Sequence, residues 1–106
     1  MSADVVAVLI TAPDAETAER LARALVEERF AACVNVIPGM QSIYRWEGKV
    51  EEASEHLLVA KTRAARVSAL AARVRALHPY ALPEVVALPV KGGSDAYLRW
   101  VVAESR

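Results

Sequence analysis

The stretch of sequence that decides the fold is residues 31–62, AACVNVIPGMQSIYRWEGKVEEASEHLLVAKT. Two segments rich in Val, Ile, Tyr and Trp flank Glu47 and Gly48, a pattern that predicts one long β-hairpin with a two-residue turn. A glycine at the second turn position supplies the positive φ that such a turn requires, so Gly48→Val is expected to damage the tip. The residue pairs expected across the hairpin are Trp46 with Lys49, Tyr44 with Glu51, and Val36 with Val59.

Both halves of this hairpin are longer than the usual strand of five or six residues, so part of it is expected to project from its own subunit. Pro38 and Gly39 divide the first half, because proline cannot donate to a strand ladder and is tolerated only at an edge or a bulge. We expect a base that belongs to the subunit's own sheet and an arm, 41–54, that pairs with a neighbour. Tyr44 and Trp46 are candidate trimer-interface residues, since aromatic side chains often anchor subunit contacts.

Composition indicates one domain, residues 1–106, with no cationic field. Thirteen basic and thirteen acidic residues cancel, so nucleic acid and anionic membranes are not expected as partners. No apolar run approaches the length of a membrane span, and the N-terminus lacks the basic segment of a signal peptide. Cys33 is the single cysteine and cannot form an internal disulfide, which agrees with a reducing compartment. The expected location is the cytoplasm.

The other elements follow from apolar runs and capping residues. The strands expected outside the hairpin are 5–11, a continuous apolar run, and 84–90, which carries Pro89. Asp14 is the expected N-cap of a first helix with an apolar stripe from Ala18 to Leu25. A second helix begins near Thr62 and stops at His78. A short terminal helix is capped by Ser94 or Asp95.

This order of elements, strand–helix–strand–strand–helix–strand with a terminal helix, is the split βαβ motif doubled, an α+β fold. In its usual antiparallel sheet the second and fourth strands lie at the edges, where both strand prolines are tolerated. The first and fourth strands are apolar on both faces, yet two helices can cover only one face. Sheets of neighbouring subunits are therefore expected to cover the remainder.

Catalytic motifs are lacking, so the protein is not expected to be an enzyme. The sequence contains no glycine-flanked serine elbow, no phosphate-binding glycine loop and no helix-borne pair of histidines with a glutamate. Glu51, Glu52 and Glu55 are expected to solvate the second half of the hairpin. Cys33, His56, His78 and Glu84 could ligate a metal such as copper, although their spacing is not a metal fingerprint and packing is the favoured role of Cys33.

The segment His78-Pro79-Tyr80 followed by Leu82-Pro83-Glu84 is the most unusual local pattern. Its prolines stiffen the chain, so the loop could present an imidazole, a phenol and a carboxylate to a ligand. Alternatively, Pro79 ends a helix and Pro83 begins an edge strand, with no ligand involved. The residues favour neither alternative.

Four segments resemble the CutA family, named for tolerance to divalent cations. They are AACVNVIPGMQSIYRWEGKVEE, KTR, HPYALPEVVALPV and DAYLRWV, within a similarity that extends from Thr11 to Val101. The resemblance implies a ferredoxin-like fold in a tight homotrimer, with the long hairpin pairing to neighbouring subunits, as in the trimers of PII signalling proteins. It also implies a link to copper and other divalent cations, with no organic cofactor.

Carried over by position, Cys33, His78 and Glu84 are the candidate metal ligands. Ile10 and Ala81 stand where some relatives carry a cysteine and a glutamate. The leading hypothesis is a cytoplasmic trimer that contributes to copper tolerance by binding metal ions. A second hypothesis is a PII-like sensor with a small-molecule cleft between subunits, and a third is a scaffold whose function is trimerisation itself. The cleft of the second hypothesis would be lined by Gln41, Lys61, His78, Tyr80 and Glu84.

Overall fold

The computed structural model describes residues 4–106 and confirms the predicted order of elements. The hairpin strands are much longer than the other two, and a 3₁₀ turn leads into the second helix. The elements are β1 (Val5–Ala12), α1 (Ala15–Glu27), β2 (Cys33–Trp46), β3 (Lys49–Arg63), the 3₁₀ turn η2 (Ala64–Arg66), α2 (Val67–Leu77), β4 (Val85–Pro89) and α3 (Asp95–Glu104).

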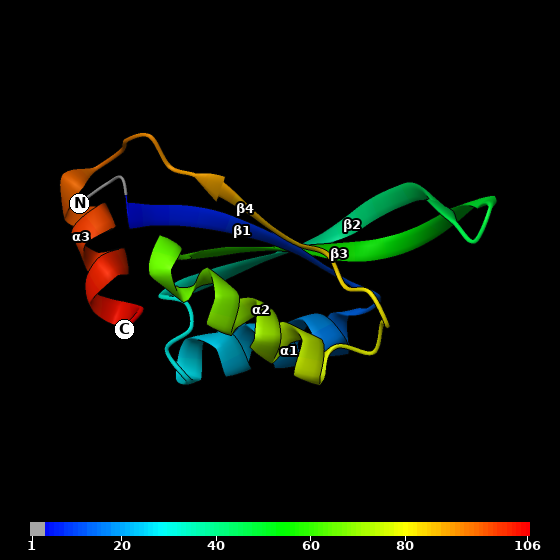
Figure 1. Ribbon diagram of the computed structural model, residues 1–106, viewed down its shortest axis with the longest axis horizontal. Coiled ribbons are helices and arrows are strands. Elements are labelled where there is room, and N and C mark those ends of the chain that lie inside the picture. Colours follow the sequence, from blue (N-terminus) through cyan, green and yellow to red (C-terminus); the bar gives the residue numbers. More distant parts are fainter. Residues whose placement is uncertain (1–3) are drawn as a thin grey trace.

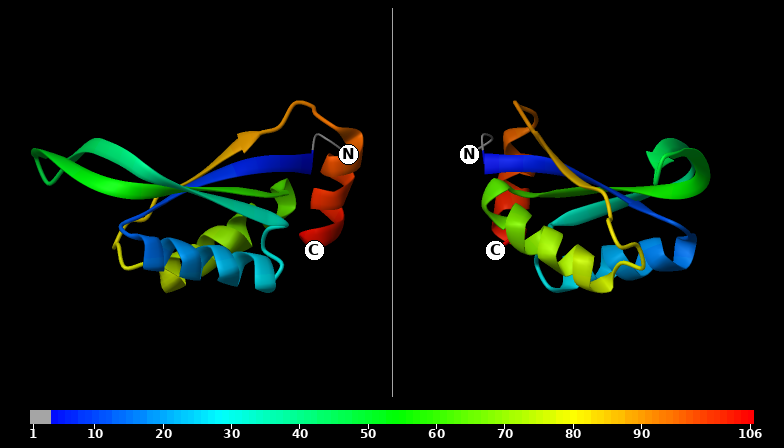
Figure 2. Two further views of the ribbon diagram at one scale, coloured as in Figure 1. Left: turned by 180° about the vertical axis from the view of Figure 1, so that it is seen from behind. Right: turned by 45° about the vertical axis from the view of Figure 1, so that its right-hand side comes forward.

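The four strands form one antiparallel sheet in the order β2-β3-β1-β4. The predicted arrangement is confirmed, because β2 and β4, the strands that contain prolines, lie at the two edges. Helices α1 and α2 lie together on one face of the sheet, and α3 packs at its end (Figure 1). The outer part of the β2–β3 hairpin extends away from all three helices in the left view of Figure 2, and the molecule is 44 Å long as a result.

The core lies between the sheet and the two helices that cover it. Even-numbered residues of β1 point toward the helices, where Val8 and Ile10 are fully buried. Leu21 and Leu25 of α1 and Leu70 of α2 pack against them. The predicted apolar stripes therefore face the sheet, as the helical period requires.

Both predicted N-caps are present. The Asp14 carboxylate accepts a hydrogen bond from the Thr17 amide at 2.8 Å, which holds the pKa of Asp14 below its usual value. The Ser94 hydroxyl accepts from the Tyr97 amide at 3.3 Å. Each cap satisfies a backbone donor that the first helical turn leaves without a partner, and so fixes where its helix begins.

The hairpin pairing is confirmed at the tip and wrong at the base. Trp46 pairs with Lys49 and Tyr44 with Glu51, but Val36 pairs with Leu58 and not with Val59. The register shifts by one residue between Ile37 and Met40, where Gly39 has a φ of 79°. Pro38 and Gly39 thus form the β-bulge that the proline favours. Residue pairs predicted by counting back from the turn are therefore wrong by one residue beyond this bulge.

The hairpin turn places two consecutive residues in the left-handed region, with φ of 50° at Glu47 and 80° at Gly48. This is the backbone of a type I′ turn, in which both central residues have positive φ. A side chain at Gly48 would meet no neighbouring atom within 4 Å, so the backbone conformation alone penalises a substitution there.

Gly48→Val is expected to lower the free energy of unfolding by about 1–2 kcal/mol, because an L-residue in this conformation is strained. Glu47→Asn is the matched control and is expected to leave stability unchanged or slightly raised, since Asn tolerates positive φ. Chemical denaturation of the two variants beside the parent measures both effects. Equal stability of Gly48→Val and the parent would contradict the assigned turn.

The second face of the sheet is covered only at one end. There Val5 packs against Leu98 and Val101 of α3. Along the rest of this face, Ile37, Val86 and Leu88 are each 46% exposed. We call this surface, together with the neighbouring residues Ala7, Leu9 and Val59 on the same side of the sheet, the open face. Among residues 4–106, no helix is long and apolar enough to cross a membrane.

Candidate functional site

The loop 78–84 lies where the hairpin arm leaves the sheet (Figure 1). Residues of this loop form one wall of a groove. The groove has a volume of about 610 Å³. Its walls combine aromatic side chains, carboxylates and hydroxyls from β1, the arm and the loop. The lining residues are Thr11, Ser42, Ile43, Tyr44, Arg45, Trp46, Glu55, Tyr80, Ala81, Leu82 and Glu84.

His78 anchors this loop to β1. Its Nε2 lies 2.7 Å from the carbonyl oxygen of Thr11, and its Nδ1 accepts a hydrogen bond from the Tyr80 amide at 3.1 Å. This pair of bonds requires a neutral imidazole that carries its proton on Nε2 and donates it to the carbonyl. His78 is buried, and both ring nitrogens are engaged within the chain, so the imidazole positions the loop.

Tyr80 connects the loop to the base of the arm. Its hydroxyl donates to the Glu55 carboxylate at 2.8 Å, and its ring lies 4.7 Å from that of His78. Burial, with the hydrogen bond to Glu55 second, raises the pKa of Tyr80 to about 12. Glu55 is 7% exposed, so the expectation that it solvates the strand is wrong. Glu55 accepts this hydrogen bond only because loop 78–84 folds against β3.

Replacing Tyr80 by Phe is expected to change how stability depends on pH above pH 10. A raised pKa in the folded state contributes stability below the unfolded value, 10.0, and this contribution is lost as the pH rises toward 12. The parent should therefore lose stability more steeply than Tyr80→Phe between pH 10 and pH 12. Urea denaturation across that range measures the difference, and parallel profiles would contradict the raised pKa of Tyr80, of which burial of the phenol is the main cause.

Cys33 lies at the opposite end of the sheet, on the same side as the open face. It pairs with Lys61 across the ladder, and its thiol is 3.9 Å from the Asn35 side-chain oxygen. Lys61 also donates to that oxygen. The Tyr97 phenol of α3 is close by, and burial together with Cys33 raises the pKa of Tyr97. The half-buried thiol is therefore surrounded by polar groups.

The candidate residues fall into two separate groups within one chain. Cys33 pairs with Lys61, and Lys61 pairs with Ala7 of β1, so Cys33 lies at the level of Ala7. His78 contacts Thr11, which lies about 13 Å further along β1. Gln41 bonds to Glu52 on the arm at 2.9 Å. Tyr80 and Glu84 line the groove, whereas His78 is not among its lining residues. Within residues 4–106, no three His, Cys, Asp or Glu side chains gather as a metal-binding group.

Comparison with known proteins gives one consistent family. The sequence profile described as CutA1 divalent ion tolerance protein matches residues 6–104. The divalent-cation tolerance protein CutA of Thermus thermophilus is 55% identical over 94 residues, which cover 89% of this chain and 91% of that protein. The protein of the same name from Pectobacterium atrosepticum is 46% identical, with 97% and 94% covered.

Solved structures agree with this result. The divalent cation tolerance protein (Cut A1) from Thermus thermophilus superimposes with a TM-score of 0.94 at 51% identity, covering 96% of this chain and 99% of the other. CutA1 from Oryza sativa gives a TM-score of 0.95 at 44% identity, covering 100% and 98%. Some relatives are longer, since the chain spans 56% of the chloroplastic protein CutA of Arabidopsis thaliana, to which it is 48% identical over 101 residues, 95% of this chain.

Proposed function

Because the chain belongs to the CutA1 divalent ion tolerance family, we propose that it is a homotrimer that contributes to divalent cation tolerance by binding a metal ion, copper being the first candidate. It acts by binding and without catalysis. The names of its relatives support a role in divalent cation tolerance. The observation that supports a trimer is the open face, an apolar surface of the sheet that α3 covers only at one end.

The open face and the arm offer the surfaces that an oligomer would bury. Ile37, Val86 and Leu88 place exposed apolar side chains on both edge strands. Tyr44 and Trp46, 44% and 43% exposed, add aromatic surface on an arm that extends away from the three helices (Figure 1). A contiguous apolar surface of this kind is typical of a protein–protein interface, and aromatic residues supply much of the binding energy in such interfaces.

Trimerisation would also bring together enough side chains to ligate a metal ion. A soft-metal site needs three or four donors, and within residues 4–106 one chain provides no such group. Each candidate occurs three times in a homotrimer, and a ligand on the interface of one copy can be joined by ligands from the next. Cys33 is the first candidate because its thiol lies on the side of the open face, and thiolate is a preferred copper ligand. Glu84, exposed at the groove, is the second.

Titration of Cu(II) into the parent and into Cys33→Ala tests the metal site. We expect Cys33→Ala to weaken copper binding at least about tenfold, the usual scale for loss of a ligand or its support. Glu84→Gln tests the second candidate, and Glu16→Gln, on the exposed side of α1, is the control. Unchanged affinity in both Cys33→Ala and Glu84→Gln would remove both residues from the site.

His78→Ala serves a different purpose in the same titration. Since both imidazole nitrogens are bonded within the chain, the variant should lower stability through the loop while leaving copper affinity close to that of the parent. A large loss of affinity with an intact fold would instead make His78 a ligand.

A further inference from the structure

A second groove runs along α3, away from the loop 78–84. It has a volume of about 660 Å³ and combines three arginines with an apolar wall. None of its residues is a candidate for the metal site. The lining residues are Arg63, Asp95, Leu98, Arg99, Val102, Ala103 and Arg106.

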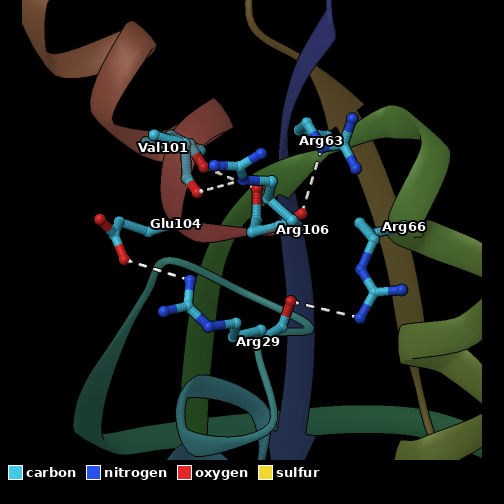
Figure 3. Close-up of polar contacts among 8 residues, drawn as sticks. Arg29, Arg63, Arg66, Val101, Glu104 and Arg106 are labelled. Carbon is cyan, nitrogen blue, oxygen red and sulfur yellow. Dashed lines mark hydrogen bonds and ion pairs between the residues drawn. The ribbon is translucent and has the colours of Figure 1, made fainter.

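Two of the arginines are held in place by backbone carbonyls at the end of α3. Arg63 Nε donates to the Ser105 carbonyl at 3.1 Å, and Arg106 Nε donates to the Ala103 carbonyl at 3.2 Å (Figure 3). A guanidinium has five N–H donors, so each anchored group keeps its terminal NH₂ groups for another acceptor. Anchoring through Nε fixes the planar fork and lowers the entropy lost when an anion binds.

The charges around the groove are unbalanced. Its lining has three guanidiniums and one side-chain carboxylate, that of Asp95. Arg66, three residues after Arg63 and outside the groove lining, donates to the Arg29 carbonyl at 3.3 Å (Figure 3), and its buried Nε has no partner among residues 4–106. The nearby Arg29 is paired with Glu104 at 3.4 Å. Three guanidiniums facing one groove match the several oxygens of a phosphate better than a single carboxylate.

The groove also has an apolar wall. Leu98 and Val102 are four residues apart and lie on one side of α3 next to the arginines, and Ala103 adjoins Val102. We propose that this groove binds a phosphomonoester whose ester group is apolar. The phosphate is held by the guanidiniums of Arg63, Arg99 and Arg106, and the ester group packs on Val102 and Ala103, beside the small exposed part of Leu98.

Calorimetric titration of the full chain with phenyl phosphate and with inorganic phosphate tests the proposal. The comparison distinguishes a site for a phosphomonoester from a site for free phosphate. We expect phenyl phosphate to bind about tenfold more tightly, because the ring buries apolar area that free phosphate lacks. Arg63→Gln and Arg99→Gln should each weaken binding of phenyl phosphate about tenfold, the usual loss for one charge-assisted hydrogen bond. Asp95→Asn should tighten it, since a repelling carboxylate is removed.

Arg20→Gln, on the exposed side of α1, is the control and should bind like the parent. Arg99→Gln keeps the test valid if Arg63→Gln loses stability with its contact to Ser105. Absence of saturable binding of either compound, or equal binding by the parent and Arg99→Gln, would overturn the site. Equal affinity for phenyl phosphate and inorganic phosphate would overturn the apolar subsite.

Discussion

Replacing Leu21 by Ala is expected to lower the free energy of unfolding by about 3 kcal/mol, within the range of fully buried leucines. Leu21 has no exposed surface and lies in the cluster where α1 packs against β1 and α2. The substitution removes apolar contacts from both neighbours and leaves a cavity that close-packed helices cannot fill. Urea denaturation at fixed protein concentration measures the effect, since assembly would make apparent stability depend on concentration.

Val26→Ala is the matched control for Leu21→Ala. Val26 lies on the same helix but is 39% exposed, so its truncation should cost well under half as much as that of Leu21. Equal losses in the two variants would mean that α1 does not present the Leu21 face to the sheet.

The second large effect is expected from Leu88→Glu on the open face. Leu88 is 46% exposed in the single chain and lies on β4 opposite Ala7. If this face is buried between subunits, each copy would have to bury a carboxylate, at several kcal/mol per ion, and the trimer would dissociate into monomers. Far-UV circular dichroism should remain that of the parent, because the substituted side chain lies outside the core between sheet and helices.

Val26→Glu provides the matched control for assembly. It introduces the same charge at a residue of similar exposure on α1, which covers the other face of the sheet. Light scattering after size exclusion should find Val26→Glu assembled like the parent and Leu88→Glu monomeric. A fully assembled Leu88→Glu would show that the open face is not the interface.

Local chemistry was sufficient to predict most of the fold. The turn at Glu47 and Gly48, the caps at Asp14 and Ser94, and the edge positions of β2 and β4 all follow from backbone rules that depend on a few neighbouring residues. The register at the base did not follow, because a proline indicates a bulge or an edge but not how many residues the bulge adds. The structure shows one added residue, so Val36 pairs with Leu58 and not with Val59.

The candidate site was less predictable because it depends on contacts between distant segments. The stiff loop from His78 to Glu84 was evident from its prolines, and it does line a groove. That His78 bonds to Thr11 and Tyr80 to Glu55 depends on how α2 lies on the sheet. Periodicity predicts which side of a helix is buried, but not which residue of a neighbouring strand its end reaches.

Sedimentation equilibrium of the unmodified protein at micromolar concentration tests the central claim, assembly through the open face and the arm, most directly. The expected mass is three times the 11.5 kDa of one chain, independent of salt concentration because the proposed interface is apolar. A mass of 11.5 kDa throughout the micromolar range would contradict it.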